Sequence, residues 1–528
     1  MRFKGAISGF AVAFAVAALV ISACGGGGEK ATQAPTAAAT ATAKPPAAAT
    51  ATPVPAPAAT PTPQGPQPKY GGVLKSIMLG PATSLDMTAT RGGGWHITIP
   101  MFNYLVQNRL PFDQGYKSGL GPDLAVSWTL SDDSKVYTFK LADGVTWHDG
   151  KAFAASDVVF SFKRIASDPS IPTAPFRSTM ANIATYEAPD TKTVKLTLKN
   201  PSASFLAGLT SIGNLIYPEQ AVQSILDFKP IGTGPYKFVS FSQNDRSVLA
   251  RNPNYFKKDK AGNQLPYLDG LELYAITDAA AKIAAVRTGR ADMMDMVTSV
   301  TETDYQTIVK DNAGLIGYPL NNGWLYWTFK NAPPFDNVNV RKAFSLALDR
   351  QQWDLLSNGG GGDPYVLYMD TASRWKVPVD EVKTFPGYRQ PKDADIAEAK
   401  RLLKEAGFTL TSINVIVGTY PNQATAAAGI IRQNLGIDTK IDVQDRVAFT
   451  QTRTNKNFQI LYDSNSAAID DPSSVFPAWY RSDGNQNSTG FGDATVDQWI
   501  DRLESTFDQA ARLKLAQDIQ KRLANELF

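Results

Sequence analysis

The sequence predicts a mixed α/β protein with several sheets and two or three domains. Residues 70–528 are too many for a single hydrophobic core, which sets the expected domain count. Tyr137, Phe139 and Leu141 alternate with their neighbours, as the residues of a half-buried strand do, whereas segment 340–348 spaces its apolar residues as one face of a helix. Because the two patterns alternate irregularly along the chain, we expect several sheets in a mixed fold.

The first 24 residues predict an export signal that ends in a lipid-modified cysteine. A basic start at 1–4 precedes an apolar run at 6–21, and Cys24 follows the small residues of Ile21-Ser22-Ala23. The run, of about 16 residues, is marginal for a membrane span. This order resembles the bacterial lipobox, which implies a diacylated Cys24 at the outer face of the cytoplasmic membrane. The alternative is an ordinary signal peptide with a chance cysteine.

Residues 25–70 predict a disordered tether. The segment consists almost entirely of Ala, Thr, Pro, Gly and Gln and offers almost no large apolar residue to bury. If stretched, it would reach roughly 130 Å. Cys24 is the single cysteine of the chain, so a lipidated Cys24 would leave no intrachain disulfide.

Composition and motifs argue against several classes of function. Lys+Arg total 52 and Asp+Glu total 49, and no basic block occurs, so we expect no nucleic-acid partner. No HExxH, CxxC, Walker-type or Gly-x-Ser-x-Gly motif occurs, so no metal, no cofactor and no enzyme activity are expected. Carboxylate-only catalysis stays open. His148, beside a turn, is expected to be structural.

In the first half, a strand, a turn and a helix are predicted in succession. The strand covers 136–141, Asp143-Gly144 turns it, and a return strand runs from Val145 to His148. Ser156 is then expected to cap a helix. Its apolar positions are Val158, Val159, Phe162 and Ile165.

In the second half, apolar spacing predicts helices. The first carries the stripe Val340, Ala343, Phe344, Ala347 and Leu348. In the second, Asp395 and Glu398 resemble a capping box and Gly407 stands at the C′ position. Its expected core residues are Ala399, Leu402, Leu403 and Ala406. Roughly the last 35 residues predict two helices. They place Ala516, Ile519, Leu523 and Leu527 on one face.

An ordered set of short motifs resembles one family, the extracytoplasmic solute-binding proteins of ABC importers, family 5, which covers oligopeptide, dipeptide and nickel binders. Each motif alone is weak, but their order and spacing hold from about residue 71 onward. The motifs are Gly121-Pro122-Asp123-Leu124-Ala125, Tyr137 to Leu141 continuing to Trp147-His148-Asp149-Gly150, Asp157 to Ser161, Gly232-Thr233-Gly234-Pro235-Tyr236, Arg251 to Tyr255, Leu268-Asp269-Gly270, Gly289-Arg290-Ala291-Asp292 and Val340-Arg341-Lys342-Ala343.

The resemblance implies a two-lobe periplasmic-binding-protein fold with an extra subdomain on the first lobe. Lobe I is expected at 71–115 and 230–320, the extra subdomain at 116–229, and lobe II at 321–528. Members usually continue past Phe528 and return to lobe I, so we expect that return to be missing here. The implied mechanism is hinge closure on a ligand, read by a membrane permease with its ATPase. We expect a monomer that meets the membrane through its lipid anchor only.

The expected ligand site combines three stretches of the chain. A glycine loop with Arg91, Gly92, Gly93 and Trp95 permits close approach, and Arg91 suits a carboxylate or phosphate. Trp324, Tyr326 and Trp327 are candidates to stack on a ligand, although at least one of Tyr326 and Trp327 should be core, because neighbours on a strand face opposite ways. The resemblance adds Asp295 and Met296, which follow the Gly289-Arg290-Ala291-Asp292 motif where relatives contact ligand backbone.

The late loop departs from the resembled family. Peptide-binding relatives pair the peptide amino group with an aspartate, but Ala468 stands at that position and Asn465 replaces a common aromatic. An unpaired buried ammonium is costly, which argues against ordinary dipeptides bound in that way. Asp470 and Asp471 are candidates to substitute, or they cap the following helix.

The sequence therefore predicts a lipid-anchored receptor for a peptide or another organic solute. An oligosaccharide receptor on the same fold is the alternative that the tryptophans and Ala468 leave open. A signalling lipoprotein that reports its ligand to a partner, and a secreted hydrolase, are further alternatives. The hydrolase would need a nucleophile–base pair, and the sequence singles out none.

Overall fold

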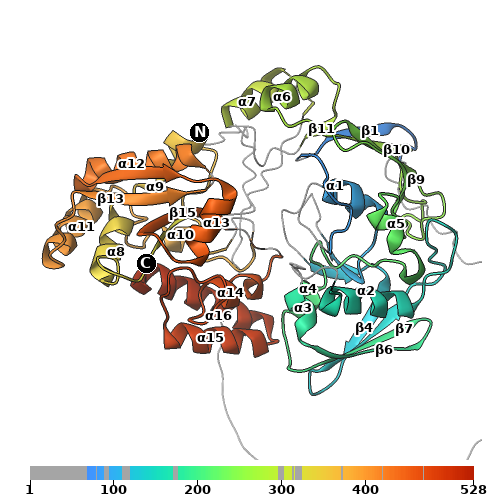
Figure 1. The fold of residues 1–528 in the computed structure, drawn as a ribbon. Coiled ribbons are helices and arrows are strands. Elements are labelled where there is room, and N and C mark those ends of the chain that lie inside the picture. The colour runs from blue at the N-terminus through green and yellow to red at the C-terminus, as the bar shows by residue number, and fades with distance from the viewer. Residues whose placement is uncertain are drawn as a thin grey trace, which may run out of the picture. The chain divides into compact units, whose positions relative to one another are not determined.

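Four sheets organise the described part of the chain, shown in the computed structural model of Figure 1. The structure describes residues 68–78, 80–88, 94–109, 119–169, 177–294, 302–311, 314–315, 324–369, 373–418, 420–465, 467 and 469–527. Residues 69–528 form a compact unit. The predicted export signal and nearly all of the predicted tether therefore lie outside the described residues.

The first sheet has five strands in the order β11-β1-β10-β9-β8. They are β1 (Val73–Ile77), β8 (Tyr236–Phe241), β9 (Arg246–Arg251), β10 (Gly270–Tyr274) and β11 (Met293–Met294). β1 runs parallel to β10 and β11, and β9 runs antiparallel to both its neighbours. The hydrophobic core of this first sheet also includes residues from α1 (Trp95–Thr98) and the 3-10 turn η1 (Ile99–Met101). Helices α6 (Ala279–Arg287) and α7 (Glu302–Asp311) follow β10 and β11 in the chain.

The second sheet is antiparallel and has four strands in the order β4-β5-β7-β6. They are β4 (Ala125–Leu130), β5 (Val136–Leu141), β6 (Ile183–Asp190) and β7 (Thr193–Leu198). Helix α2 (Ala155–Ser167) packs into the same core, α3 (Arg177–Ala181) lies against α2, and β2 (Val106–Arg109) pairs with β3 (Gly119–Pro122) in a separate ribbon. Short turns of helix follow: α4 (Phe205–Gly208), η2 (Glu219–Ala221) and α5 (Gln223–Leu226).

This sheet confirms one predicted strand and corrects two details beside it. Tyr137, Phe139 and Leu141 of β5 are buried, as the alternation requires. The predicted return strand at 145–148 is wrong, because only an isolated bridge from Thr146 to Ala152 forms there. Helix α2 begins before Ser156: its cap is Ala154, whose N–H donates to Asp157.

The third sheet has the order β12-β15-β13-β14. Its strands are β12 (Trp324–Phe329), β13 (Ser412–Val417), β14 (Asp438–Val443) and β15 (Ile460–Asn465), and only the β12–β15 pair is antiparallel. The helices nearby are α8 (Val338–Ala347), α9 (Arg350–Asn358), α10 (Val379–Val382), α11 (Asp393–Glu405), α12 (Pro421–Leu435) and α13 (Arg446–Thr454).

The predicted helical stripes in this region are confirmed, and the predicted capping box is wrong. Val340, Ala343, Phe344 and Ala347 of α8 are buried with Ala399, Leu402 and Leu403 of α11, and Gly407 takes the left-handed conformation expected at C′. The last predicted residue of each stripe, Leu348 or Ala406, is the C-cap beyond the helix and is only partly buried. The helix instead begins at Asp393. Asp395 accepts hydrogen bonds from the Gly387 N–H and the Lys392 ammonium and pairs with Arg389.

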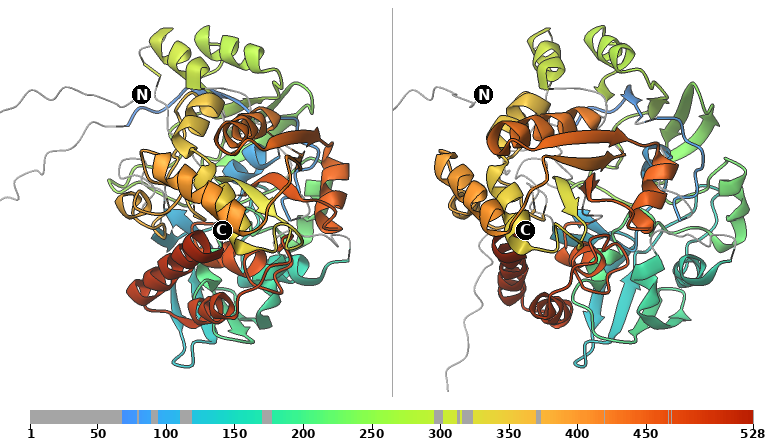
Figure 2. Two further views of the ribbon diagram at one scale, coloured as in Figure 1. Left: turned by 90° about the vertical axis from the view of Figure 1, so that its left-hand side faces the viewer. Right: turned by 60° about the vertical axis from the view of Figure 1, so that its left-hand side comes forward.

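The chain continues into a helical group, with α15 (Ala494–Ser505) and α16 (Gln509–Arg522) side by side in Figures 1 and 2. The turn η3 (Pro472–Ser474) and the short helix α14 (Phe476–Trp479) precede them, and η4 (Leu523–Leu527) follows. Ala516, Ile519 and Leu523 are buried in this group, as predicted. Among the residues that the structure describes, we find no helix with the length and apolar character needed to cross a membrane.

Candidate ligand-binding site

Neighbouring aromatic residues of β12 face opposite sides of the third sheet. Trp327 packs into the core beside Phe344 of α8, with their ring centroids 6.5 Å apart. Tyr326 packs on the other side, edge-to-face against Trp479 of α14 at 6.3 Å. Trp327 is therefore a core residue, and Tyr326 is the member of the pair available to a site.

Opposite Tyr326 in the strand register lies Asp463 of β15. Helix α13 covers this side of β15, with Phe449 packed against Leu461 and Arg453 paired with Asp463. The spacing explains both contacts, because four helical residues and two strand residues each advance the chain by about 6 Å. Helix α13 therefore places an apolar side chain on Leu461 and a cation beside Asp463, the next residue on the same face of the strand.

Three contacts link Asp463, Arg453, Trp479 and Tyr326 in a chain whose two ends, Asp463 and Tyr326, are paired in the register of β15 and β12. Arg453 Nη1 lies 3.3 Å from Asp463 Oδ2, and the Arg453 guanidinium carbon lies 4.5 Å from the centre of the Trp479 ring. Trp479 in turn contacts Tyr326. Arg453 also donates to Gln486 at 2.5 Å. We call Tyr326, Asp463, Arg453 and Trp479 the aromatic–acid cluster.

Charge and burial set the chemistry of this cluster. Burial raises the pKa of Asp463, against the opposing effect of the Ser464 N–H and of Arg453. Burial and the nearby Asp463 also raise the pKa of Tyr326. Among the described residues, Asp463 accepts one hydrogen bond from the Ser464 N–H, at 2.8 Å, and makes a single contact with Arg453. Because a carboxylate can accept about four hydrogen bonds, it retains acceptor capacity for an N–H or O–H group of a ligand.

The two candidate acids of the late loop are engaged elsewhere. Both oxygens of Asp471 lie 2.6 Å from Arg512, and both side chains are fully buried. Asp471 also caps η3 through the Ser473 N–H, which agrees with the capping alternative. Asp470 accepts from Ser373 and lies 4.0 Å from Arg374.

The remaining predicted site residues divide into three groups. Trp95 is partly buried in the core of the first sheet and stacks on His96 at 3.7 Å. Trp324 and Asn465 are paired in the register of β12 and β15, two positions beyond the Tyr326–Asp463 pair. The others lie outside the described residues: Arg91, Gly92, Gly93, Asp295, Met296 and Ala468.

The sequence prediction did not include Asp463, Arg453 or Trp479. Strand alternation in 460–465 would have placed Asp463 and Asn465 on one face, since they are two residues apart. Arg453 and Trp479 lack such a signal, because their meeting depends on how α13 and α14 lie over the sheet.

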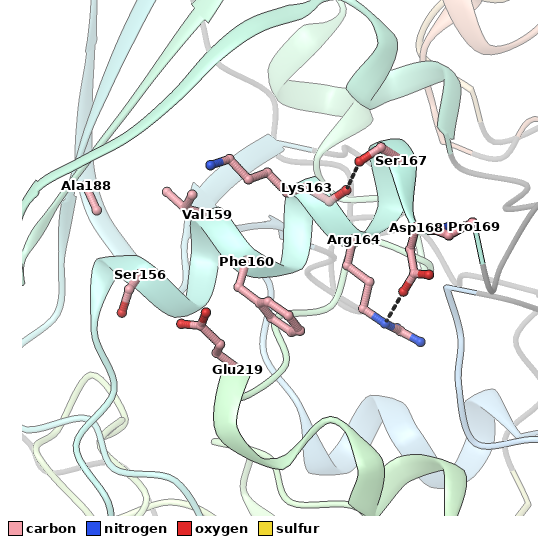
Figure 3. Close-up of a pocket in the computed structure, with 10 residues that line it drawn as sticks. All are labelled: Ser156, Val159, Phe160, Lys163, Arg164, Ser167, Asp168, Pro169, Ala188 and Glu219. Carbon is pink, nitrogen blue, oxygen red and sulfur yellow. Dashed lines mark hydrogen bonds and ion pairs between the residues drawn. The ribbon is translucent and has the colours of Figure 1, made fainter.

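A surface pocket of 470 Å³ lies elsewhere, along α2 (Figure 3). Lys163, Arg164 and Ser167 contribute to it from the helix, and Glu219 contributes from η2. The Arg164 guanidinium is already used, because it pairs with Asp86 and donates to Thr88 at 2.7 Å. None of the residues of the aromatic–acid cluster lines this pocket. Within the described ranges, no group of three or more His, Cys, Asp or Glu residues could hold a metal ion.

Comparison with known proteins defines the class of this two-lobe fold. A family model described as bacterial extracellular solute-binding proteins, family 5, matches residues 119–487, which is more than half of the chain. The chain belongs to this family. Its described sheets also match solved binding proteins: the ABC transporter substrate-binding protein CtaP of Listeria monocytogenes gives a TM-score of 0.72 at 24% identity, covering 86% of this chain and 91% of that one.

Curated relatives carry names from ABC transport. A putative ABC transporter peptide-binding protein of Brucella ovis is 32% identical over 361 residues, which cover 65% of this chain and 61% of that protein. Heme-binding protein A of Haemophilus influenzae is 30% identical over 334 residues, or 57% of this chain and 56% of that protein. The chain thus matches less than two thirds of the length of either relative.

Proposed function

We propose that this chain is the lipid-anchored solute receptor of an ABC importer and that it binds a peptide or another organic solute between two lobes. The family match over residues 119–487 carries the proposal. The names of the relatives, which mention peptide and heme, support an organic ligand. The receptor binds and delivers its ligand without catalysing a reaction.

The proposed lobes follow the sheets. Lobe I at 71–115 and 230–320 would hold the sheet of β1 and β8 to β11, the extra subdomain at 116–229 that of β4 to β7, and lobe II at 321–528 that of β12 to β15. A ligand that contacts both lobes stabilises their closed arrangement, and the permease with its ATPase recognises that state. The receptor acts as a monomer at the outer face of the cytoplasmic membrane, held by Cys24.

The aromatic–acid cluster is the proposed ligand wall of lobe II. Tyr326 supplies an aromatic ring, and Asp463 supplies acceptor capacity close to the positions of Trp324 and Asn465. Asp463 takes the role for which the sequence offered Asp470 and Asp471 as candidates, because Asp471 pairs with Arg512 and Asp470 accepts from Ser373. A carboxylate can accept hydrogen bonds both from the ammonium group of a peptide and from the hydroxyl groups of an oligosaccharide, so both ligand classes belong in the test.

Thermal unfolding in the presence of candidate ligands tests this function. The full chain, carrying Cys24→Ser to prevent lipidation, is melted with short peptides, cello- and xylo-oligosaccharides, heme and nickel. A ligand present at about 100 times its Kd adds about 2.7 kcal/mol and raises Tm by a few degrees. We expect such a shift from an organic ligand and none from nickel. A cooperative transition that no organic ligand moves, or product formation from a peptide or glycoside, would contradict the proposal.

Asp463→Asn tests the wall itself. Loss of a hydrogen bond to a charged group costs about 1.5–3 kcal/mol, so we expect the Kd for the ligand that shifts Tm to rise about 10- to 150-fold. The matched control is Asp442→Asn, which changes an exposed carboxylate on β14 and should leave Kd unchanged. Equal affinities for the two variants would place the wall elsewhere.

A further inference from the structure

Glu504, in the last turn of α15, contacts a segment 300 residues earlier in the chain. The Ala203 N–H donates to the Glu504 backbone carbonyl at 2.9 Å. The Ser204 hydroxyl donates to Glu504 Oε2 at 3.3 Å, and Ser202 Oγ lies 3.2 Å from Ser204 Oγ. Glu504 therefore joins the proposed extra subdomain to the proposed lobe II through both its main chain and its side chain.

The nearby cation is largely committed to other groups. Arg512 of α16 pairs with Asp471 through two contacts of 2.6 Å, and it donates to Ser473 Oγ at 2.7 Å and to the Leu503 carbonyl at 3.2 Å. Glu504 Oε1 is shielded from solvent, and among the described residues it has no hydrogen-bond partner at normal geometry. Across the contact with the 202–204 segment, the side chain that donates a hydrogen bond to this carboxylate is Ser204, while Ser473 and Arg512 stabilise its charge from the side of α16 and η3.

Burial raises the pKa of Glu504. The Ser473 and Ser204 hydroxyls and the Arg512 charge oppose this rise, and the negative charge of Asp471 reinforces it. In this contact the protonated form of Glu504 is therefore more stable, relative to the charged form, than it would be in water. Once water reaches the side chain, its pKa returns toward the ordinary value near 4.3.

We propose that Glu504 is a proton-linked contact between the 202–204 segment and α15, so that acidification favours the closed arrangement of the lobes and tightens ligand binding. The proposal rests on the proposed function, because it assumes that the two lobes move apart. It assigns to Glu504 a role that does not require contact with the ligand.

The sign follows from proton linkage. A group whose pKa is higher in the closed state binds more protons there, so closing takes up a proton between the two pKa values. In that window the ratio of closed to open protein rises by up to about tenfold for each unit that the pH falls. Above both pKa values, Glu504 is charged in both states and the ratio no longer depends on it.

Distance measurement between two spin labels tests the proposal without a known ligand. Because Cys24 is the single cysteine, a Cys24→Ser background accepts labels cleanly at Val126→Cys on β4 and Leu356→Cys on α9, two exposed positions. As the pH falls from about 7 toward the ordinary glutamate pKa near 4.3, we expect the short-distance, closed population to grow. A distance distribution of the parent protein that does not change with pH would overturn the proposal.

Variants of the Glu504–Ser204 contact test whether Glu504 itself causes the pH dependence of the closed fraction, which a purely structural role would not do. Glu504→Gln mimics the protonated carboxyl and should hold the closed fraction constant with pH. Ser204→Ala removes a hydrogen bond to the carboxylate and should move the response to higher pH. The control Glu405→Gln, an exposed residue of α11, should keep the wild-type response. A response that Glu504→Gln leaves unchanged would also overturn the proposal.

The outcome separates this proposal from the proposed function. If a peptide or oligosaccharide raises Tm and closes the labelled protein, but Glu504→Gln responds to pH as the parent does, the receptor stands and the proton link is wrong. If no such ligand binds, yet the parent responds to pH and Glu504→Gln does not, the proton link stands and the ligand assignment is wrong.

Discussion

At the residue scale, the arginine–aspartate pairs of this chain differ in how completely the partners satisfy each other. Arg512 and Asp471 form two short contacts and are fully buried, so removing either partner would leave a buried charge unpaired. Arg453 and Asp463 make one longer contact and keep 22% and 14% of their side chains exposed. The first pair fixes α16 against the late loop, and the second leaves an acid with capacity for a ligand.

His148 gives a testable pH dependence of stability. Its Nδ1 accepts from the Gly232 N–H at 3.2 Å and its Nε2 lies 3.0 Å from the Gly234 carbonyl, which requires the neutral ring with its proton on Nε2. Burial lowers the pKa of His148 to about 4. The unfolded chain, with a pKa near 6.5, binds the proton first, so stability is lost as the pH falls from 6.5 toward 4.

The expected loss from His148 reaches about 3 kcal/mol at pH 4, from a shift of about 2.5 pKa units. Denaturant unfolding across this pH range, compared between the parent and His148→Gln, isolates the effect from the titration of carboxylates. The variant should show a flatter pH profile than the parent. Parallel profiles for the parent and His148→Gln would show that this imidazole titrates alike in both states.

At the element scale, α8 depends on one aromatic side chain. Phe344 contacts the rings of Trp327, Phe329, Phe335 and Phe408, at centroid distances of 5.5 to 6.5 Å. Phe344→Ala should cost about 3–5 kcal/mol, because it removes buried area and leaves a cavity between α8 and the sheet. Val338→Ala, an exposed change in the same helix, should cost less than about 0.5 kcal/mol. Tryptophan fluorescence during urea unfolding measures both, and similar midpoints for the two variants would contradict this packing.

Elements with strong internal periodicity were predictable from the sequence, and features set by distant partners were not. The strand around Phe139 and the stripe of α8 follow from spacing alone, because burial of one face fixes them. The prediction of a return strand at 145–148 was wrong because Trp147 is buried in the core. Its indole N–H donates to Asp157 of α2 at 3.3 Å, which directs the chain into that helix. Asp395 looked like a capping residue, yet Lys392, Arg389 and Gly387 engage it.

The candidate site shows the same division. Opposite facing of Tyr326 and Trp327 follows from the strand period, and the structure assigns Trp327 to the core. Asp463 gains its significance from Arg453 and Trp479, which come from two other elements. No local pattern brings α13 and α14 to that strand, so a single sequence names the aromatic residue and misses the acid beside it.

At the scale of the whole molecule, an importer receptor must stay near its permease while its lobes open and close. The family model matches residues 119–487 of the compact unit at 69–528, whereas residues 1–24 and 25–70 carry the expected anchor and tether. A single acyl chain binds membranes only marginally, so a diacylated Cys24 is the modification that would hold the protein. The predicted tether would then give the folded part freedom to move relative to that anchor.

Cys24→Ala tests this anchorage in cells. The parent protein should sediment with the membrane fraction and incorporate a labelled fatty acid. Cys24→Ala should lose the label and leave the membrane fraction, because the apolar run of about 16 residues is marginal as a span. The matched control Thr32→Ala changes the tether and should behave as the parent does. A Cys24→Ala protein that stays membrane-bound at parental levels would show that the apolar run, or a partner, holds the chain instead of lipid.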